Sequence, residues 1–251
     1  MDILVIPDTQ VKAGVDIRHI EACGNYIAVH KPDVIVVIGD WWDMQSLSRY
    51  GTKLELEGTR VVDDLQVGVD AMNALFKPIQ TKWLKQYYKP RKIFCTGNHD
   101  PSVRIQRLYD DYPQLEGIIK EPKLSDWGFE VYDFLEVAVI EGIRFSHYFQ
   151  NSHSAKKSPL GGMIDTMIKN AGFSFVQGHQ QGLKIGKHYL GDGTVRIGIV
   201  AGSFYQHKER FMGTQGNEHW SGIIHLRNAK NGTADIAEIG IATMLEEYLQ
   251  R

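Results

Sequence analysis

The stretch Arg91-Lys-Ile-Phe-Cys-Thr-Gly-Asn-His-Asp100 joins a short apolar run to a crowded polar loop. The run has the composition of a buried strand, and the Gly-Asn pair predicts the turn that ends it. Asn98, His99 and Asp100 therefore share one loop at the carboxyl end of a strand. Open α/β sheets bind their ligands at such ends, so the loop is more typical of a site than of a simple connection.

Two earlier loops have the same construction. The apolar run Asp2–Pro7 ends in Asp8-Thr9-Gln10, and the run Pro32–Ile38 ends in Gly39-Asp40-Trp41-Trp42-Asp43. Runs of Val and Ile bounded by turn residues predict strands buried on both faces, as in a parallel sheet.

A helix is expected between these two runs, because apolar residues recur at helical spacing over 15–30. A strand–helix–strand unit with short connections implies a right-handed crossover and parallel strands. The three strands would then deliver Asp8, Asp40 and Asn98 to one edge of one sheet. Converging oxygen ligands with a His nearby predict a divalent-metal site.

The overall composition is that of a soluble globular protein. The chain has 251 residues, 43% hydrophobic and 23% charged, which suits one α/β domain over residues 1–251. A net charge of −2 gives no global electrostatic argument for nucleic-acid binding, although a local basic groove remains an alternative. Cys23 and Cys95 lie in apolar patterns and are expected to be buried thiols rather than a disulfide. We expect no signal peptide, no membrane span and a cytoplasmic location.

The pattern changes after residue 112, from strand–helix alternation to mostly strands. Glu141-Gly142 and Asn231-Gly232 predict hairpin turns. Further helices are expected at 59–88 (kinked or divided at Pro78), 102–112, 159–171 and 241–249, and further strands at 129–134, 137–140, 143–147, 173–177, 195–201, 221–226 and 234–239. One domain with two stacked sheets flanked by helices accommodates both halves.

Two later strand ends complete a set of five polar loops: His147 follows one strand, and Gly178-His179-Gln180-Gln181 follows another. Loops carrying Asp, Asp, Asn-His, His and His-x-Gln in this order resemble the calcineurin-like metallophosphoesterase superfamily over about residues 4–205. The combination of Gly39-Asp40-x-x-Asp43 with Gly97-Asn98-His99-Asp100 is highly specific. The resemblance implies an α/β fold, a four-layer α/β/β/α sandwich of two mixed sheets flanked by helices.

The resemblance also implies a site for two divalent metals about 3.5–4 Å apart. Asp40 would bridge the metals, with Asp8 at the first and Asn98, His147 and His179 at the second. The expected ligand positions are Asp8, Gln10, Asp40, Asn98, His147, His179 and Gln181. His153 is a local rival of His147, which the strand-end position favours.

Catalysis would rest on His99 and Asp43. In the family, the His99 position contacts the scissile phosphate and helps the leaving oxygen to depart, while Asp43 would hold the imidazole and favour its protonated form. Such an acid contributes about 10²–10⁴ in rate. The implied nucleophile is a metal-bound hydroxide.

The chain departs from the family pattern at two positions of the first metal. The family usually has Asp-x-His and Gly-His-x-His, where this chain has Gln10 and Gln181. Gln offers a neutral amide oxygen, a harder and weaker ligand than imidazole, so manganese or magnesium is favoured over zinc or iron. We expect Mn²⁺, with Mg²⁺, Zn²⁺, Ni²⁺ and Fe as alternatives.

Three residues are candidates for contacting the substrate. Arg104 and Arg107 lie at i and i+3 on an expected helix, and planar guanidinium groups suit phosphate oxygens. Trp41 lies beside the bridging aspartate, although packing is the more ordinary role for it.

The sequence predicts a metal-dependent hydrolase of a phosphodiester or phosphomonoester. A nucleotide or nucleic-acid substrate is slightly favoured, because aromatic residues near the loops could stack on a base. The alternative is a phosphate- or partner-binding metalloprotein with weak or no catalysis, which the two Gln residues motivate. The intact pair of His99 and Asp43 argues against it. The sequence indicates neither a protein partner nor an oligomeric state.

Overall fold

The computed structural model describes residues 1–152, 154–208 and 218–249, and its strands form two sheets. The strands are β1 (Ile3–Ile6), β2 (Val34–Val37), β3 (Arg91–Cys95), β4 (Phe129–Tyr132), β5 (Ala138–Ile140), β6 (Ile143–Ser146), β7 (Phe175–Gln177), β8 (Leu183–Tyr189), β9 (Val195–Ala201), β10 (Gly222–Lys230) and β11 (Thr233–Gly240). The α-helices are α1 (Arg18–His30), α2 (Lys53–Leu56), α3 (Val61–Phe76), α4 (Leu84–Tyr87), α5 (Pro101–Asp111), α6 (Ile164–Ala171) and α8 (Ile241–Tyr248).

Both sheets are mixed. The six-stranded sheet has the order β11-β10-β1-β2-β3-β4, in which β1 to β4 are parallel neighbours and β10 and β11 are antiparallel. The five-stranded sheet has the order β5-β6-β7-β9-β8, with parallel pairs at its centre and antiparallel pairs at its edges. The predicted parallel pairing of the first strands is confirmed.

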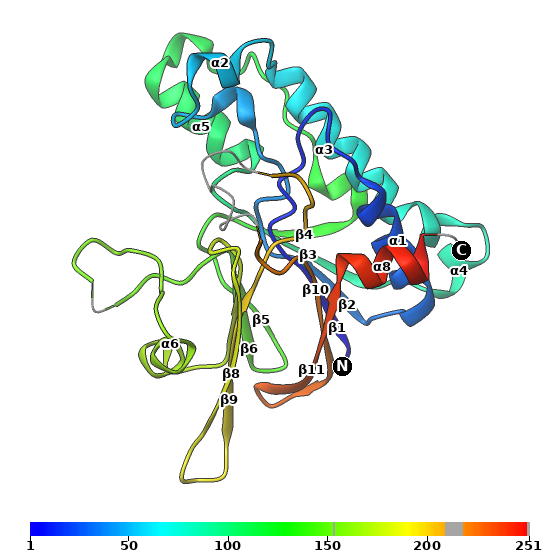
Figure 1. Cartoon of the computed structure of the whole chain (residues 1–251), viewed down its shortest axis with the longest axis vertical. Helices are drawn as coiled ribbons and strands as arrows, with labels where there is room; N and C mark the ends of the chain where they lie inside the picture. Colours follow the sequence, from blue (N-terminus) through cyan, green and yellow to red (C-terminus); the bar gives the residue numbers. More distant parts are fainter. Residues whose placement is uncertain (153, 209–217, 250–251) are drawn as a thin grey trace.

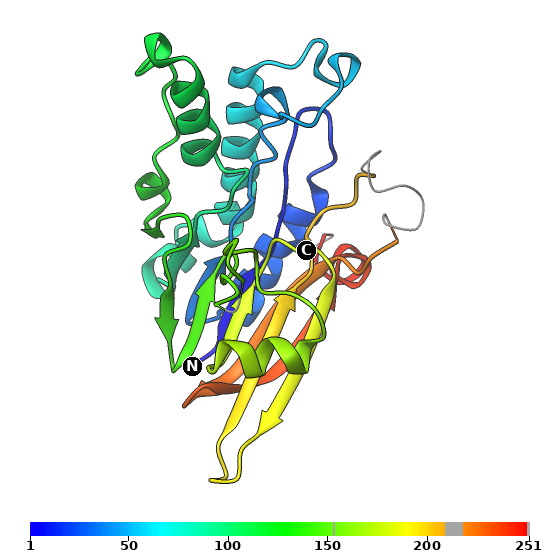
Figure 2. The ribbon, with the colours of Figure 1, turned by 90° about the vertical axis from the view of Figure 1, so that its left-hand side faces the viewer.

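Three apolar layers hold these elements together. One cluster fills the space between α1, α3, α8 and the six-stranded sheet, a second lies between the two sheets, and a third lies under α6 on the outer face of the five-stranded sheet. Figures 1 and 2 show the helices on the two outer sides and the sheets between them. The predicted α/β/β/α sandwich of two mixed sheets is therefore confirmed.

The expected hairpin turns form where the sequence places them. Asn231 and Gly232 have φ angles of 52° and 79°, and they join β10 to β11. Glu141 and Gly142, with φ of 50° and 81°, join β5 to β6. Two successive positive φ angles suit the right-handed twist of a two-residue hairpin.

One element is divided as the sequence predicts, and another was not expected. The helix expected over 59–88 is divided at Pro78 into α3, a 3₁₀ turn η2 (Lys77–Gln80) and α4, as expected for a residue that lacks a backbone N–H. Strand β8 was not expected, because its residues Leu183–Tyr189 mix charged and apolar types and include Gly186. It forms by pairing along its whole length with β9.

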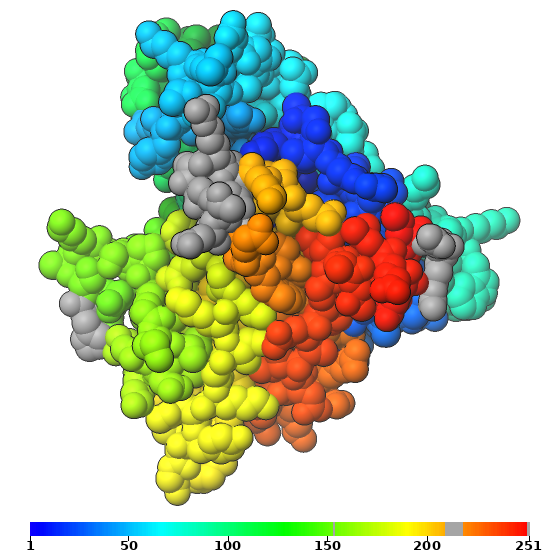
Figure 3. Space-filling view, viewed as in Figure 1, coloured from blue at the N-terminus to red at the C-terminus, as the bar shows by residue number. Residues whose placement is uncertain are grey.

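The fold directs the carboxyl ends of β1, β2 and β3 toward a helical lobe that contains α2, α5 and one end of α3 (Figure 1). Figure 3 shows this lobe in space-filling form, cyan and green at the top of the molecule. Both cysteines are buried free thiols. Within the described residues, the helices are too short or too polar to cross a membrane.

Candidate metal centre

The five polar loops meet at one edge of the sandwich. Asp8, Asp40 and Asn98 follow β1, β2 and β3, while His147 and His179 follow β6 and β7 of the other sheet. Backbone hydrogen bonds connect the loops: Gln10 N–H donates to the Asp40 carbonyl at 2.9 Å, and Gly178 N–H donates to the His147 carbonyl at 3.0 Å. The site is therefore assembled across both sheets.

The side chains expected at the second metal point at one another. Ligand atoms of Asp40, His147 and His179 all lie within 4.8 Å of one another. The Nε2 atom of His147 lies 3.3 Å from Asp40 Oδ2 and 3.2 Å from Asn98 Oδ1. Its Nδ1 atom is 3.0 Å from the Ile38 carbonyl, to which Nδ1–H donates.

This arrangement places three electron-pair donors around one point. When Nδ1 carries the proton, the lone pair of His147 Nε2 faces two oxygens that are themselves acceptors, so a cation or a second proton must lie between them. Burial alone would lower the pKa of His147, but attraction to Asp40 outweighs it and raises that pKa to about 9. The same attraction holds the pKa of Asp40 below its usual range despite burial. The donor set fits a divalent cation, which would take the place of that proton.

Asp8 has the surroundings expected of a metal ligand on the other side of Asp40. It is fully buried, and its Oδ1 accepts a hydrogen bond from His179 N–H at 3.0 Å. Its Oδ2 has no partner among the described residues. Burial raises the pKa of Asp8 to about 7, and the charge of Asp40 adds to this. A buried carboxylate oxygen without a partner is costly, and a cation would satisfy it.

Gln10 and Gln181 stand where the family usually has imidazoles. Both have left-handed backbones, with φ of 42° and 55°, and Gln10 is buried. The side-chain oxygen of Gln181 accepts a hydrogen bond from the Tyr205 hydroxyl at 2.7 Å. Gln181 thus ties its loop to the segment that follows β9, and its amide oxygen keeps one lone pair for a cation.

His99 lies beside this group and faces two competing neighbours. Its Nδ1 is 3.2 Å from Asp43 Oδ1, which can only accept, and 3.0 Å from Arg104 Nη2, which can only donate. Burial opposes the charged imidazole, but Asp40 and Asp43 outweigh burial and raise the pKa of His99. When the ring is protonated, Nδ1–H donates to Asp43, and Nε2–H takes no part in that hydrogen bond.

Asp100 has a positioning role that the sequence reasoning missed. Its buried carboxylate accepts backbone N–H groups from Gly97 at 2.7 Å, Asp40 at 3.0 Å, Trp41 at 2.9 Å and Trp42 at 3.2 Å. It therefore binds the loop after β2 to the loop after β3. The only signal in the sequence was a carboxylate at the end of the Gly-Asn-His-Asp motif.

The remaining candidates lie in different surroundings. Trp41 is fully buried, and its indole N–H donates to the Gly68 carbonyl of α3 at 3.1 Å; the expected substrate contact is corrected to packing, because no face of the ring reaches solvent. Arg104 is buried and Arg107 is half-buried, and both line a cavity that adjoins His99 through Arg104. His153 lies outside the described residues.

Comparisons with known proteins give a structural likeness and a family match. The structure is similar to the crystal structure of the Pseudomonas putida nuclease MPE, with 12% sequence identity, a TM-score of 0.37, and coverage of 88% of this chain and 83% of that chain. No curated protein matches the sequence. A model of the family described as calcineurin-like phosphoesterase matches residues 1–202. Because that match spans well over half of the chain, the protein belongs to the calcineurin-like phosphoesterase family.

Proposed function

We propose that the protein hydrolyses phosphoesters with two divalent cations, preferentially Mn²⁺, held at the strand ends. Family membership supports a metal-dependent phosphoester hydrolase. The observation that carries the proposal is the convergence of His147 Nε2, Asp40 Oδ2 and Asn98 Oδ1 on one point. Asp40 would be shared by both cations, with Asp8, Gln10 and Gln181 around the first and His179 completing the second.

The bound cations would neutralise the phosphate and acidify a water nucleophile. The chain itself supplies the proton for the leaving oxygen. Asp43 accepts from Nδ1 of protonated His99, so Nε2–H is the proton that His99 can donate. Arg104 touches the same ring, and its positive charge opposes the charged imidazole, which favours transfer of the Nε2 proton to the leaving oxygen as the P–O bond breaks.

The substrate is proposed to be a phosphodiester or phosphomonoester, with a nucleotide or nucleic acid favoured over other esters. Arg104 beside His99, and Arg107 in the same cavity, support a phosphoester substrate because guanidinium groups bind phosphate oxygens. The cytoplasmic location and the single-domain extent over residues 1–251 remain predictions.

A second candidate function is a metalloprotein that binds phosphate or a partner with weak or no catalysis. The hydrogen bond between Tyr205 and Gln181 favours it, because one of the two lone pairs of an expected first-metal ligand is already engaged. The preserved contact between His99 and Asp43 favours the enzyme, because a binding protein gains nothing from an acid for the leaving group.

The test is hydrolysis of an aryl phosphate and a bis-aryl phosphodiester with Mn²⁺, Mg²⁺, Zn²⁺ or Ni²⁺. We expect turnover with Mn²⁺ and a loss of about 10²–10⁴ in kcat for His99→Ala, with metal affinity retained by titration calorimetry. His188→Ala is the matched control, since His188 lies on β8, paired with Arg196. Metal binding without turnover of either ester would favour the binding protein, and failure to bind metal would refute both functions.

A further inference from the structure

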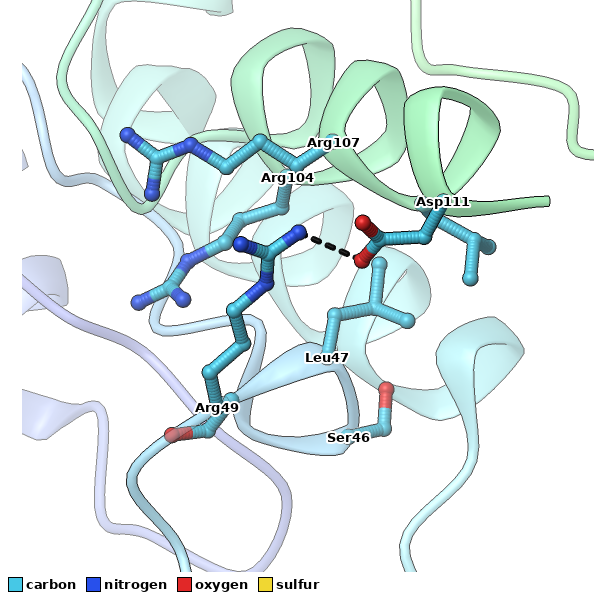
Figure 4. Close-up of a pocket in the computed structure, with 8 residues that line it drawn as sticks. Ser46, Leu47, Arg49, Arg104, Arg107 and Asp111 are labelled. Carbon is cyan, nitrogen blue, oxygen red and sulfur yellow. Dashed lines mark hydrogen bonds and ion pairs between the residues drawn. The ribbon is translucent and has the colours of Figure 1, made fainter. Parts of the chain in front are cut away.

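A cavity of about 200 Å³ lies beside the catalytic residues, between α5 and the 3₁₀ helix η1 (Gln45–Leu47). Figure 4 shows that Arg104 and Arg107 reach it from α5, and that Arg49 reaches it from the segment after η1. Arg104 belongs to both places, because it lines the cavity and its Nη2 lies 3.0 Å from His99 Nδ1. The cavity is thus adjacent to the proposed leaving-group acid, but the metal ligands do not line it.

The cavity is strongly cationic in a protein of net charge −2. Three guanidinium groups line it against one carboxylate, Asp111, which forms an ion pair with Arg49 (Figure 4). Arg104 is only 4% exposed, and its Nε has no hydrogen-bond partner among the described residues. A buried guanidinium donor without an acceptor is unfavourable, so the cavity has the chemistry of an anion site.

Two tyrosines lie near this charged region. Tyr50 follows Arg49 and is 94% exposed. Burial raises the pKa of Tyr148 and the charge of Arg107 opposes that rise, while the ring of Tyr148 lies 4.8 Å from that of His179. The cavity therefore shares Arg104 with the surroundings of His99, and the exposed ring of Tyr50 follows Arg49 directly in the chain.

We propose that this cavity binds a second phosphate, next to the scissile one along a single-stranded nucleic acid, with Tyr50 stacking on a neighbouring base. This inference rests on the proposed phosphoesterase function. Planar guanidinium forks bind phosphate oxygens in pairs, and a cationic groove with aromatic platforms is how proteins hold single strands without reading sequence. A substrate with one phosphate would leave the cavity unused.

The first test compares thymidine oligonucleotides under Mn²⁺: the dinucleotide with one phosphate and the trinucleotide with two. A charged hydrogen bond contributes about 1.5–3 kcal/mol, so we expect kcat/KM to be about 10- to 100-fold higher for the trinucleotide. Arg49→Gln and Arg107→Gln should each reduce this preference about tenfold. Arg91→Gln is the matched control, because Arg91 forms a similar exposed pair with Glu130 at the other end of β3.

Equal kcat/KM for the two substrates in the wild-type protein would overturn the second-phosphate site. Thymidine 3′,5′-bisphosphate forms a further arm. If Arg49→Gln and Arg107→Gln lower kcat/KM for the bisphosphate but not for the trinucleotide, the site serves a mononucleotide bisphosphate and the nucleic-acid assignment is wrong.

A second measurement separates this inference from the proposed function. Fluorescence anisotropy of a labelled thymidine oligomer in EDTA reports strand binding without hydrolysis. We expect Arg49→Gln and Arg107→Gln to weaken binding about tenfold. The slope of the logarithm of the binding constant against the logarithm of the salt concentration should fall in magnitude by about one. Arg91→Gln should bind as the wild type does. If no ester is hydrolysed with any cation, the proposed function fails, and unchanged anisotropy in the two variants overturns the cavity assignment independently.

Discussion

Replacing Gly178 by Ala tests the position of Asp8 without changing a proposed ligand. A Cβ atom at position 178 would lie 2.3 Å from Asp8 Oδ1 and 3.1 Å from Ile38 Cγ2. Real Cβ contacts essentially never fall under 3.0 Å, so the Asp8 carboxylate must move by at least about 0.7 Å. The backbone at Gly178 does not need positive φ, so the strain falls on Asp8.

That displacement is large for a metal ligand. Metal–ligand distances tolerate about ±0.2 Å, and Asp8 Oδ1 would also lose the hydrogen bond that it accepts from His179 N–H at 3.0 Å. We expect first-metal affinity to fall about 10- to 100-fold, as for loss of a group that orients a ligand. The kcat/KM for a bis-aryl phosphodiester should fall by about 10²-fold, the usual cost of a 1 Å misplacement.

Calorimetric titration with Mn²⁺, steady-state kinetics and thermal melting form the assay. Gly182→Ala is the matched control in the same loop, since the nearest atom to its added Cβ is the Gln180 carbonyl oxygen at 3.8 Å. A folded Gly178→Ala protein that binds two Mn²⁺ ions with wild-type affinity would refute Asp8 as a ligand. If Gly178→Ala does not fold, Asp8→Asn measured in the same way decides the question.

Three further outcomes are expected. The double variant Gln10→His/Gln181→His should tighten the first Mn²⁺ site, because imidazole is the stronger ligand; identical titrations would contradict the assignment of both residues. Mn²⁺ affinity should fall as the pH drops below about 9, where His147 gains the proton that a metal must displace; calorimetry that shows pH-independent affinity from 6 to 9 would contradict this. His19 donates from Nε2 to the Phe204 carbonyl at 3.0 Å, and burial lowers its pKa to about 4. Because that value lies below the usual 6.5, the neutral ring stabilises the fold above pH 6.5, and up to about 3 kcal/mol is lost as the pH falls toward 4; urea melts of His19→Gln should show a weaker acid dependence, and an unchanged one would contradict it.

Local patterns in the sequence are informative where a strand is short, apolar and followed by a turn. Strands β1, β2 and β3 are fully or largely buried runs of this kind, and their order along the chain already places Asp8, Asp40 and Asn98 at one edge. Strand β8 shows the opposite case. Its half-buried residues include charged types, so its conformation depends on pairing with β9 rather than on its own composition.

The sequence by itself determined the family, the two-sheet fold and the residues at the strand ends, because backbone preference and burial leave a periodic trace in neighbouring residues. Only the tertiary structure decided which side chains meet. Asp100 accepts the N–H groups of residues 58–60 positions away, and His147 Nδ1 donates to a carbonyl 109 positions away. Arg49 and Asp111 meet across 62 positions to form the cationic cavity. Such contacts depend on sheet order and helix placement, and no local pattern encodes them.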